Sequence, residues 1–158
     1  MNKAFVNNMI GIQLFCIILC WSCSSDDSEK IVSNIKSFKD KTPFEIETIL
    51  GKPDTSYTKN ILTNKYFIQH YKSHKTDIRH LNGKVAEVIL HEPENLNFRP
   101  ETIEKFGFEF VEPTKYDPAA MISWKDLEGF SDISFYLVGT KNDNPSEPNF
   151  KIFFNLKK

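Results

Sequence analysis

The stretch TDIRHLNGKVAEVILH, residues 76–91, sets two strand-like runs on either side of an Asn-Gly pair. Asn-Gly favours a two-residue turn, because both residues tolerate the positive φ that a tight hairpin requires. The flanking runs are rich in Ile and Val, which are typical of β-strands. We therefore predict a β-hairpin in which Leu81 pairs with Lys84 and His80 pairs with Val85.

Upstream of this hairpin, the sequence predicts two short helices and one further strand. Ile31, Ile35 and Phe38 keep the spacing of one helical face. The segment 42–50, TPFEIETIL, begins with Thr-Pro and carries Glu three residues after the threonine, which is the pattern of a capping box. A glycine follows and ends the helix. Residues 65–72, KYFIQHYK, are rich in aromatic side chains and predict a strand.

The second half of the chain begins in a similar way. Residues 99–107, RPETIEKFG, match the Pro, Ile and Glu positions of residues 42–51 and also end in glycine, so they predict another helix. Residues 139–149, GTKNDNPSEPN, are polar and predict an exposed loop between two strands. The predicted strands of this half are residues 120–124, 133–138 and 150–156.

Helices followed by antiparallel strands, twice in one chain, predict an α+β fold with short helices packed on an antiparallel sheet. Two arrangements fit this order. One has two small layered units, the other has one continuous sheet with helices on one face, and in either the halves 31–95 and 96–158 are candidate tandem αα-βββ-type repeats. In both, residues 31–158 form the folded domain.

The first residues of the chain carry a separate signal. A short apolar run ends at Ser22-Cys23, and it is short for a membrane-spanning helix. A small residue directly before a cysteine at this place resembles the lipobox of bacterial lipoproteins. The resemblance implies that residues 1–22 are a signal peptide, and that Cys23 carries lipid such as palmitate and anchors the protein to the outer membrane. The alternative is an uncleaved amphipathic or transmembrane anchor.

Residues 23–30 are polar and acidic, and predict a flexible tether. Asp26, Asp27 and Glu29 also resemble the signal that sends lipoproteins to the cell surface in some Gram-negative lineages. The three cysteines of the chain all lie between residues 16 and 23, so the predicted domain contains none. A domain without disulfides depends on its core alone for stability.

The charge balance excludes some partners. The formal net charge is −1 and the mean hydropathy is −0.40, which predicts a soluble domain with no basic field for nucleic acid. We expect no cofactor, no metal and no enzymatic activity, because no nucleophile with a base and no ligand set stands out. The four histidines are interpreted as polar strand residues, with no carboxylate arranged beside them; they are His70, His74, His80 and His91.

Residues 50–53, LGKP, and 82–85, NGKV, carry a further resemblance. The segment from about residue 42 to residue 90 is similar to outer-membrane lipoproteins of the SmpA/OmlA type. The same αα-βββ unit occurs twice in tandem in the β-lactamase-inhibitor-protein-like fold, which the two halves of this chain together resemble. These resemblances imply a non-catalytic module of the cell envelope that binds an envelope or extracellular protein. They concern the fold more than the function.

The alternative function is a surface lipoprotein that binds carbohydrate or another small ligand through exposed aromatic residues. Trp124 and Phe130 bracket a charged turn, where an exposed Trp would anchor a partner or a sugar ring, and Tyr136 combines a ring with a polar tip. The competing interpretation places Trp124 at a strand end in the core.

Overall fold

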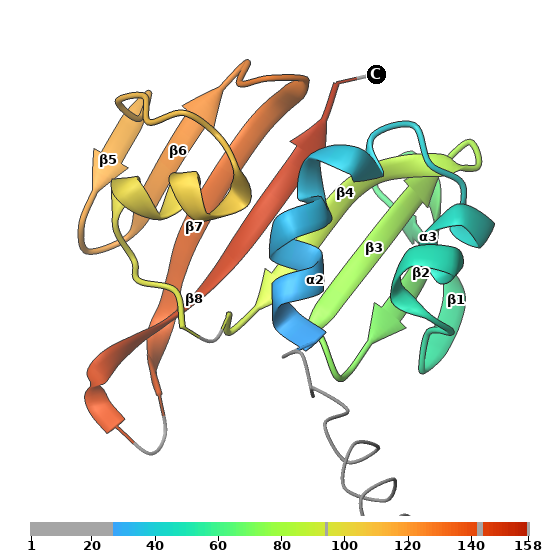
Figure 1. Ribbon diagram of the computed structural model, residues 1–158, viewed down its shortest axis with the longest axis horizontal. Coiled ribbons are helices and arrows are strands. Elements are labelled where there is room, and N and C mark those ends of the chain that lie inside the picture. The colour runs from blue at the N-terminus through green and yellow to red at the C-terminus, as the bar shows by residue number, and fades with distance from the viewer. Residues whose placement is uncertain (1–26, 94, 142–143, 158) are drawn as a thin grey trace, which may run out of the picture.

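Eight strands form one antiparallel sheet in the order β1-β2-β3-β4-β8-β7-β6-β5 (Figure 1). The computed structural model describes residues 27–157 apart from residues 94 and 142–143. The helices are α2 (Asp27–Asn34), the 3₁₀ helix η2 (Ile35–Phe38), α3 (Pro43–Leu50) and the 3₁₀ helix η3 (Pro100–Phe106). The strands are β1 (Thr55–Ile61), β2 (Asn64–Tyr71), β3 (Thr76–Leu81), β4 (Lys84–His91), β5 (Lys115–Asp117), β6 (Met121–Lys125), β7 (Phe130–Lys141) and β8 (Asn144–Leu156).

The strand order is mirrored about the middle of the sheet. Each half is a meander of four strands whose first strand lies at an edge and whose last strand lies at the centre. The halves join where β4 pairs with β8, with Val88 opposite Phe154 and Ile89 opposite Phe153. The continuous sheet, one of the two predicted arrangements, is therefore the one that forms.

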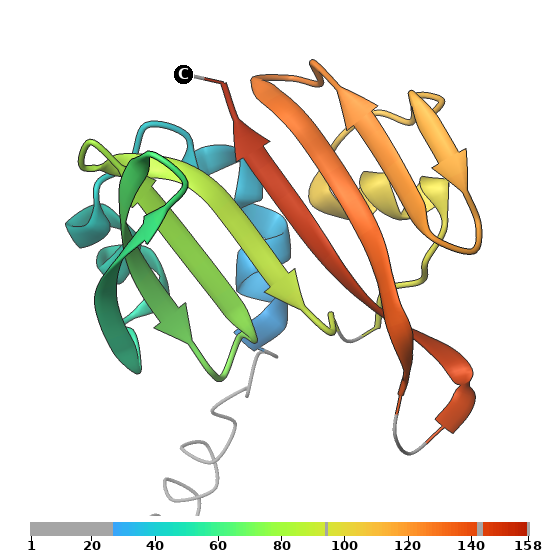
Figure 2. The same ribbon diagram turned by 180° about the vertical axis from the view of Figure 1, so that it is seen from behind.

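Within the described residues, the helices cover one face of this sheet and the other face carries none (Figures 1 and 2). The core lies between the helices and the covered face. Helices α2 and η2 contribute Ile31, Ile35 and Phe38, all of them buried. Helix η3 contributes Phe106, whose ring centroid lies 4.9 Å from that of Phe154 on β8. Side chains from both halves of the chain thus share one core.

Two local predictions are confirmed. Thr42 caps α3 by accepting a hydrogen bond from the backbone N–H of Glu45, while the Glu45 carboxylate accepts one from the backbone N–H of Thr42. In the β3–β4 hairpin, Leu81 pairs with Lys84 and His80 pairs with Val85. The turn residues Asn82 and Gly83 have φ of 54° and 77°, as this turn requires.

Other parts of the chain differ from the prediction. Strands β1 and β5 were not predicted, because edge strands exposed on both faces lack the apolar alternation that identifies a strand. The predicted loop 139–149 is mostly an extension of β7 and β8, in which Gly139 pairs with Asn149 and Thr140 with Pro148. Backbone pairing in a long hairpin does not need apolar side chains, so the polar sequence of residues 139–149 did not predict that β7 and β8 extend through it.

The N-terminal predictions lie mostly outside the described residues. The signal peptide 1–22 and the lipid attachment at Cys23 fall there. Helix α2 begins at Asp27, inside the range 23–30 predicted as a tether. Within the described part of the chain, no helix is long and apolar enough to cross a membrane.

Candidate functional site

The face of the sheet on which no helix of the described chain lies is the candidate site, and we call it the open face. Along each strand, every second side chain points into the core, and the side chains between them lie on the open face. Neighbouring strands contribute Tyr57, Ile68, Asp77, Ile89, Phe153 and Tyr136.

The open face carries a stripe of apolar and aromatic side chains. Ile68 and Ile89 are 1% and 2% exposed although none of the described helices covers them, so neighbouring side chains on the face shield them. Phe153 is half-buried, and its ring meets that of Tyr136 edge to face at 5.5 Å between centroids. Tyr57 and Tyr136 remain 47% and 41% exposed. This mixture of buried aliphatic and half-exposed aromatic residues is typical of binding surfaces.

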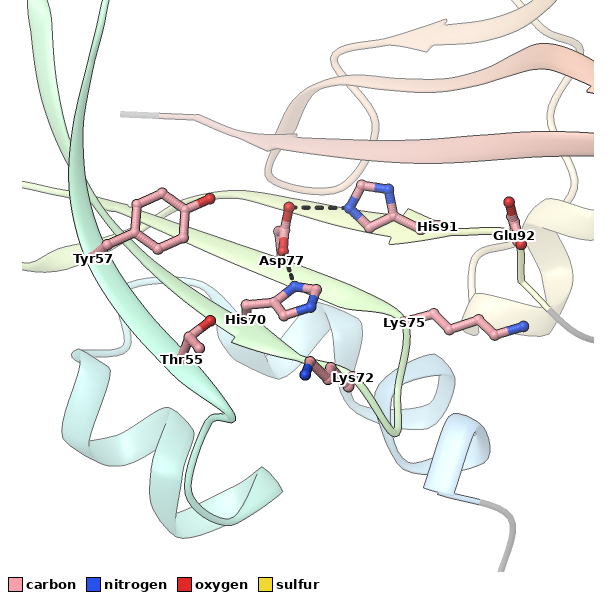
Figure 3. A pocket seen from close by; sticks show the side chains of 8 residues that line it. All are labelled: Thr55, Tyr57, His70, Lys72, Lys75, Asp77, His91 and Glu92. Carbon is pink, nitrogen blue, oxygen red and sulfur yellow. Dashed lines mark hydrogen bonds and ion pairs between the residues drawn. The ribbon is translucent and has the colours of Figure 1, made fainter.

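At one end of the open face, a carboxylate lies between two imidazole rings (Figure 3). Asp77 on β3 has one oxygen 2.6 Å from Nδ1 of His70 on β2, and the other 3.0 Å from Nε2 of His91 on β4. Partial burial raises the pKa of Asp77, but the hydrogen bonds from His91 and His70 outweigh it and lower the pKa from 3.8 to about 2. Asp77 is therefore ionised at neutral pH, and both rings turn an N–H toward it.

A pocket of about 550 Å³ surrounds this cluster. Figure 3 shows the ring of Tyr57 on one side of Asp77, and the side chain of Lys75 extending away from the two histidines. Glu92, at the rim, accepts a hydrogen bond from the side-chain amide of Asn149. The pocket is lined by Thr55, Tyr57, His70, Lys72, Lys75, Asp77, His91 and Glu92.

A second pocket of about 420 Å³ lies near the opposite ends of the central strands. Here the charges are paired within the face. Arg79 contacts Glu87 at 2.5 Å, and Lys125 contacts Asp132 at 2.7 Å. The Asp132 carboxylate raises the pKa of Lys125 above its ordinary value. These pairs leave little uncompensated charge at this end of the open face.

The other two histidines are not part of the site. His74 and His80 are buried. The Nε2 of His80 lies 2.8 Å from Oε1 of Gln69, whose amide group donates to the backbone oxygen of Pro43 and to Glu47. Burial lowers the pKa of His80 to about 4, so the ring is neutral at physiological pH. This hydrogen-bonded chain ties α3 to the sheet.

The sequence reasoning missed the carboxylate between His70 and His91. The reason is a β-bulge between Arg79 and His80, where the pairing of β3 with β4 shifts by one residue. Without the bulge, Asp77 would pair with Val88 and His91 would point to the covered face. With it, Asp77 pairs with Ile89 and shares the open face with His91. A bulge of this kind leaves no clear mark in a single sequence.

Two of the three predicted binding residues lie in the core. Trp124 and Phe130 are each 2% exposed. The Trp124 indole N–H donates to the backbone oxygen of Val111 at 2.8 Å, and its ring packs against Phe135. Phe130 packs against Phe108 and Phe154 at the covered face. The suggestion that Trp124 and Phe130 form a binding surface is therefore corrected, and only Tyr136 is accessible.

No protein family, curated protein or solved structure that we compared with this chain gave a significant match. The resemblances to lipoproteins and to the β-lactamase-inhibitor-protein-like fold therefore stay predictions. Among the described residues, no group of three or more His, Cys, Asp or Glu side chains is arranged to hold a metal ion.

Proposed function

We propose that the protein is a non-catalytic, protein-binding module of the cell envelope and that its open face contacts the partner. One observation carries this proposal: within the described residues the helices cover a single face of the sheet, while the other face presents the exposed rings of Tyr57 and Tyr136. Tyr and Phe are enriched where proteins bind one another, because each buries a large apolar area at low cost in side-chain entropy.

The opposing charges of the open face suit a protein partner better than a polyanion. Arg79 is paired with Glu87 and Lys125 with Asp132, so most charged groups near the second pocket are already compensated. A partner gains affinity mainly by covering the exposed rings of Tyr57 and Tyr136 and the half-buried ring of Phe153. Nucleic acid, which is held chiefly by uncompensated cations, is not the expected ligand.

The placement of the module is part of the same proposal. Lipid on Cys23 would hold the domain at the outer membrane, and the acids that follow would direct it to the cell surface. Blocking the lipoprotein signal peptidase with globomycin, or the change Cys23→Ala, should prevent cleavage before Cys23, so that a precursor longer by residues 1–22 accumulates. Normal cleavage after either treatment would contradict the lipid anchor.

We also propose that the two halves arose as tandem repeats. The mirrored strand order supports this, since in each half a proline-started helix directly precedes the first strand and the last strand lies at the centre of the sheet. Helix α3 is α-helical and η3 is 3₁₀, so the copies would have diverged in detail.

The binding proposal is tested by capture from envelope extracts. The double variant Tyr57→Ala/Tyr136→Ala removes the two most exposed rings of the open face and should lose the captured protein. Phe44→Ala is the matched control, because Phe44 is 77% exposed but lies on α3, over the covered face. Equal capture by wild type and the double variant would exclude the open face as the docking surface.

One observation favours the alternative of a carbohydrate or small-ligand site. The pocket of about 550 Å³ sets the exposed ring of Tyr57 beside imidazole, carboxylate and hydroxyl groups that can hydrogen-bond to a sugar. Signal on a glycan array that Tyr57→Ala abolishes, together with no captured protein, would favour this alternative.

A further inference from the structure

Two lysines lie on either side of the Asp77 cluster on the open face. Side chains from four neighbouring strands, or from the turn beside them, form a line there that we call the basic row: Lys72, His70, Asp77, His91 and Lys151. His91 pairs directly with Lys151 across β4 and β8, so Lys151 lies beside the cluster. Lys72 follows β2 two residues after His70 and lines the same pocket.

The acids near the basic row keep their charge, but their hydrogen bonds go to groups other than the two ammonium groups. Both oxygens of Asp77 accept hydrogen bonds from imidazole rings, and Glu92 accepts one from Asn149. Asp54, behind the row, accepts from the backbone N–H of Lys72 rather than from its ammonium group. Within the described residues, the ammonium groups of Lys72 and Lys151 form no ion pair. Each end of the row therefore presents an ammonium group that has no acidic partner among the described residues.

The distance between the two ends of the row sets the spacing of acidic groups that a partner needs. It crosses β2, β3, β4 and β8, three interstrand spacings or roughly 14 Å. A partner that pairs with both ammonium groups at once needs acidic groups separated by a similar distance. An extended peptide rises about 3.3 Å per residue, so carboxylates about four residues apart match this separation.

We infer that the basic row binds an acidic segment of the protein partner, with carboxylates that reach Lys72 at one end and Lys151 at the other. This inference rests on the proposed function, because it names the chemistry of the partner that the open face receives. Asp77 acts as a positioning residue that holds His70 and His91 in place between the two lysines. The half-exposed ring of Tyr57 supplies the adjoining apolar contact.

The experiment measures fluorescence anisotropy of a labelled peptide that carries four spaced glutamates, with the full chain at low ionic strength. We expect saturable binding that weakens in high salt. A peptide with glutamine in place of each glutamate should bind at least about tenfold more weakly, as should the glutamate peptide to Lys72→Gln/Lys151→Gln. The matched control is Lys59→Gln/Lys115→Gln, which removes two exposed lysines of the same sheet face outside the row and should change binding less than about twofold.

Two results would overturn the inference. One is equal weakening in both double variants, which would show a general effect of net charge. The other is saturable binding of inorganic phosphate at the row without binding of the peptide, which would assign the row to a small ion. Capture from envelope extracts separates this inference from the proposed function: a partner lost in Tyr57→Ala/Tyr136→Ala but kept in Lys72→Gln/Lys151→Gln would leave only the proposed function standing.

Discussion

Single side chains in this protein have opposite roles according to the face of the sheet they occupy. His80 points to the covered face, where burial lowers its pKa to about 4, while His70 and His91 point to the open face and donate to Asp77. The sequence shows four similar histidines, and only the strand register separates them. The different surroundings of His80 and Asp77 should be visible in how the free energy of unfolding depends on pH.

The stability of the fold should fall as the pH drops from about 6.5 to about 4. His80 is 1% exposed, and its pKa is lower in the folded than in the unfolded chain, so the unfolded chain binds more protons in this window. The stabilisation that neutral His80 gives the fold is fully present above pH 6.5, and about 3 kcal/mol of it is lost between pH 6.5 and pH 4. Urea unfolding at several pH values measures it, and His80→Gln should flatten the curve between pH 6.5 and 4. An unchanged slope in His80→Gln would contradict this role.

A second loss of stability belongs to Asp77 and lies at lower pH. Its folded pKa of about 2 is below its ordinary 3.8, so the stabilisation is present above pH 3.8 and is lost as the pH falls toward 2. In Asp77→Asn, the free energy of unfolding should vary less between pH 4 and 2, while the loss between 6.5 and 4 persists. Urea unfolding at the same pH values compares Asp77→Asn with His80→Gln and with the wild type. If the free energy of unfolding of Asp77→Asn fell between pH 4 and 2 as steeply as that of the wild type, the hydrogen bonds of Asp77 would not stabilise the fold.

At the scale of single elements, local sequence signals were reliable where they fix a turn or a helix end. Helix α3 starts at its predicted cap and stops before Gly51, and the β3–β4 turn closes at Asn82-Gly83. These signals act through backbone hydrogen bonds and φ preferences within a few residues, so no distant contact is needed to interpret them. Strands β1 and β5 have no such local signal, since they form by pairing with β2 and β6.

The change Thr42→Ala should lower the free energy of unfolding by about 1 kcal/mol, because it removes the side-chain half of the capping box. The backbone N–H and the hydroxyl of Thr42 both donate to Glu45 and lower the pKa of its carboxyl group. Chemical denaturation followed by circular dichroism gives the difference. Thr63→Ala, in the exposed β1–β2 turn, is the control and should change stability by less than about 0.5 kcal/mol. Equal effects of the two changes would argue against the cap.

At the scale of the whole molecule, the pairing of β4 with β8 makes one sheet out of two meanders. Phe154 lies at this junction: it pairs with Val88 across the sheet and its ring contacts those of Phe106 and Phe130. Because the halves share this core, we expect them to unfold together rather than as two domains.

The change Phe154→Ala should cost about 3–5 kcal/mol, since it empties a fully buried site between the halves. Unfolding should stay a single transition when followed by fluorescence and by circular dichroism. Phe44→Ala, which truncates a 77% exposed ring, should cost far less. Two separate transitions in the wild type would show that the halves are independent units.

The sequence by itself determined the α+β class, the capped helix, the central hairpin and most of the strands, because helix caps, turn residues and apolar patterning act locally. It did not determine the candidate site. A one-residue bulge in β3–β4 sets whether His91 faces Asp77 or the core, and the register of β8 against β4 brings Lys151 beside them. The side-chain period of a strand is two residues, so a shift of one residue exchanges the two faces. Only the tertiary pairing of the strands decides such a shift, and with it which residues the open face presents.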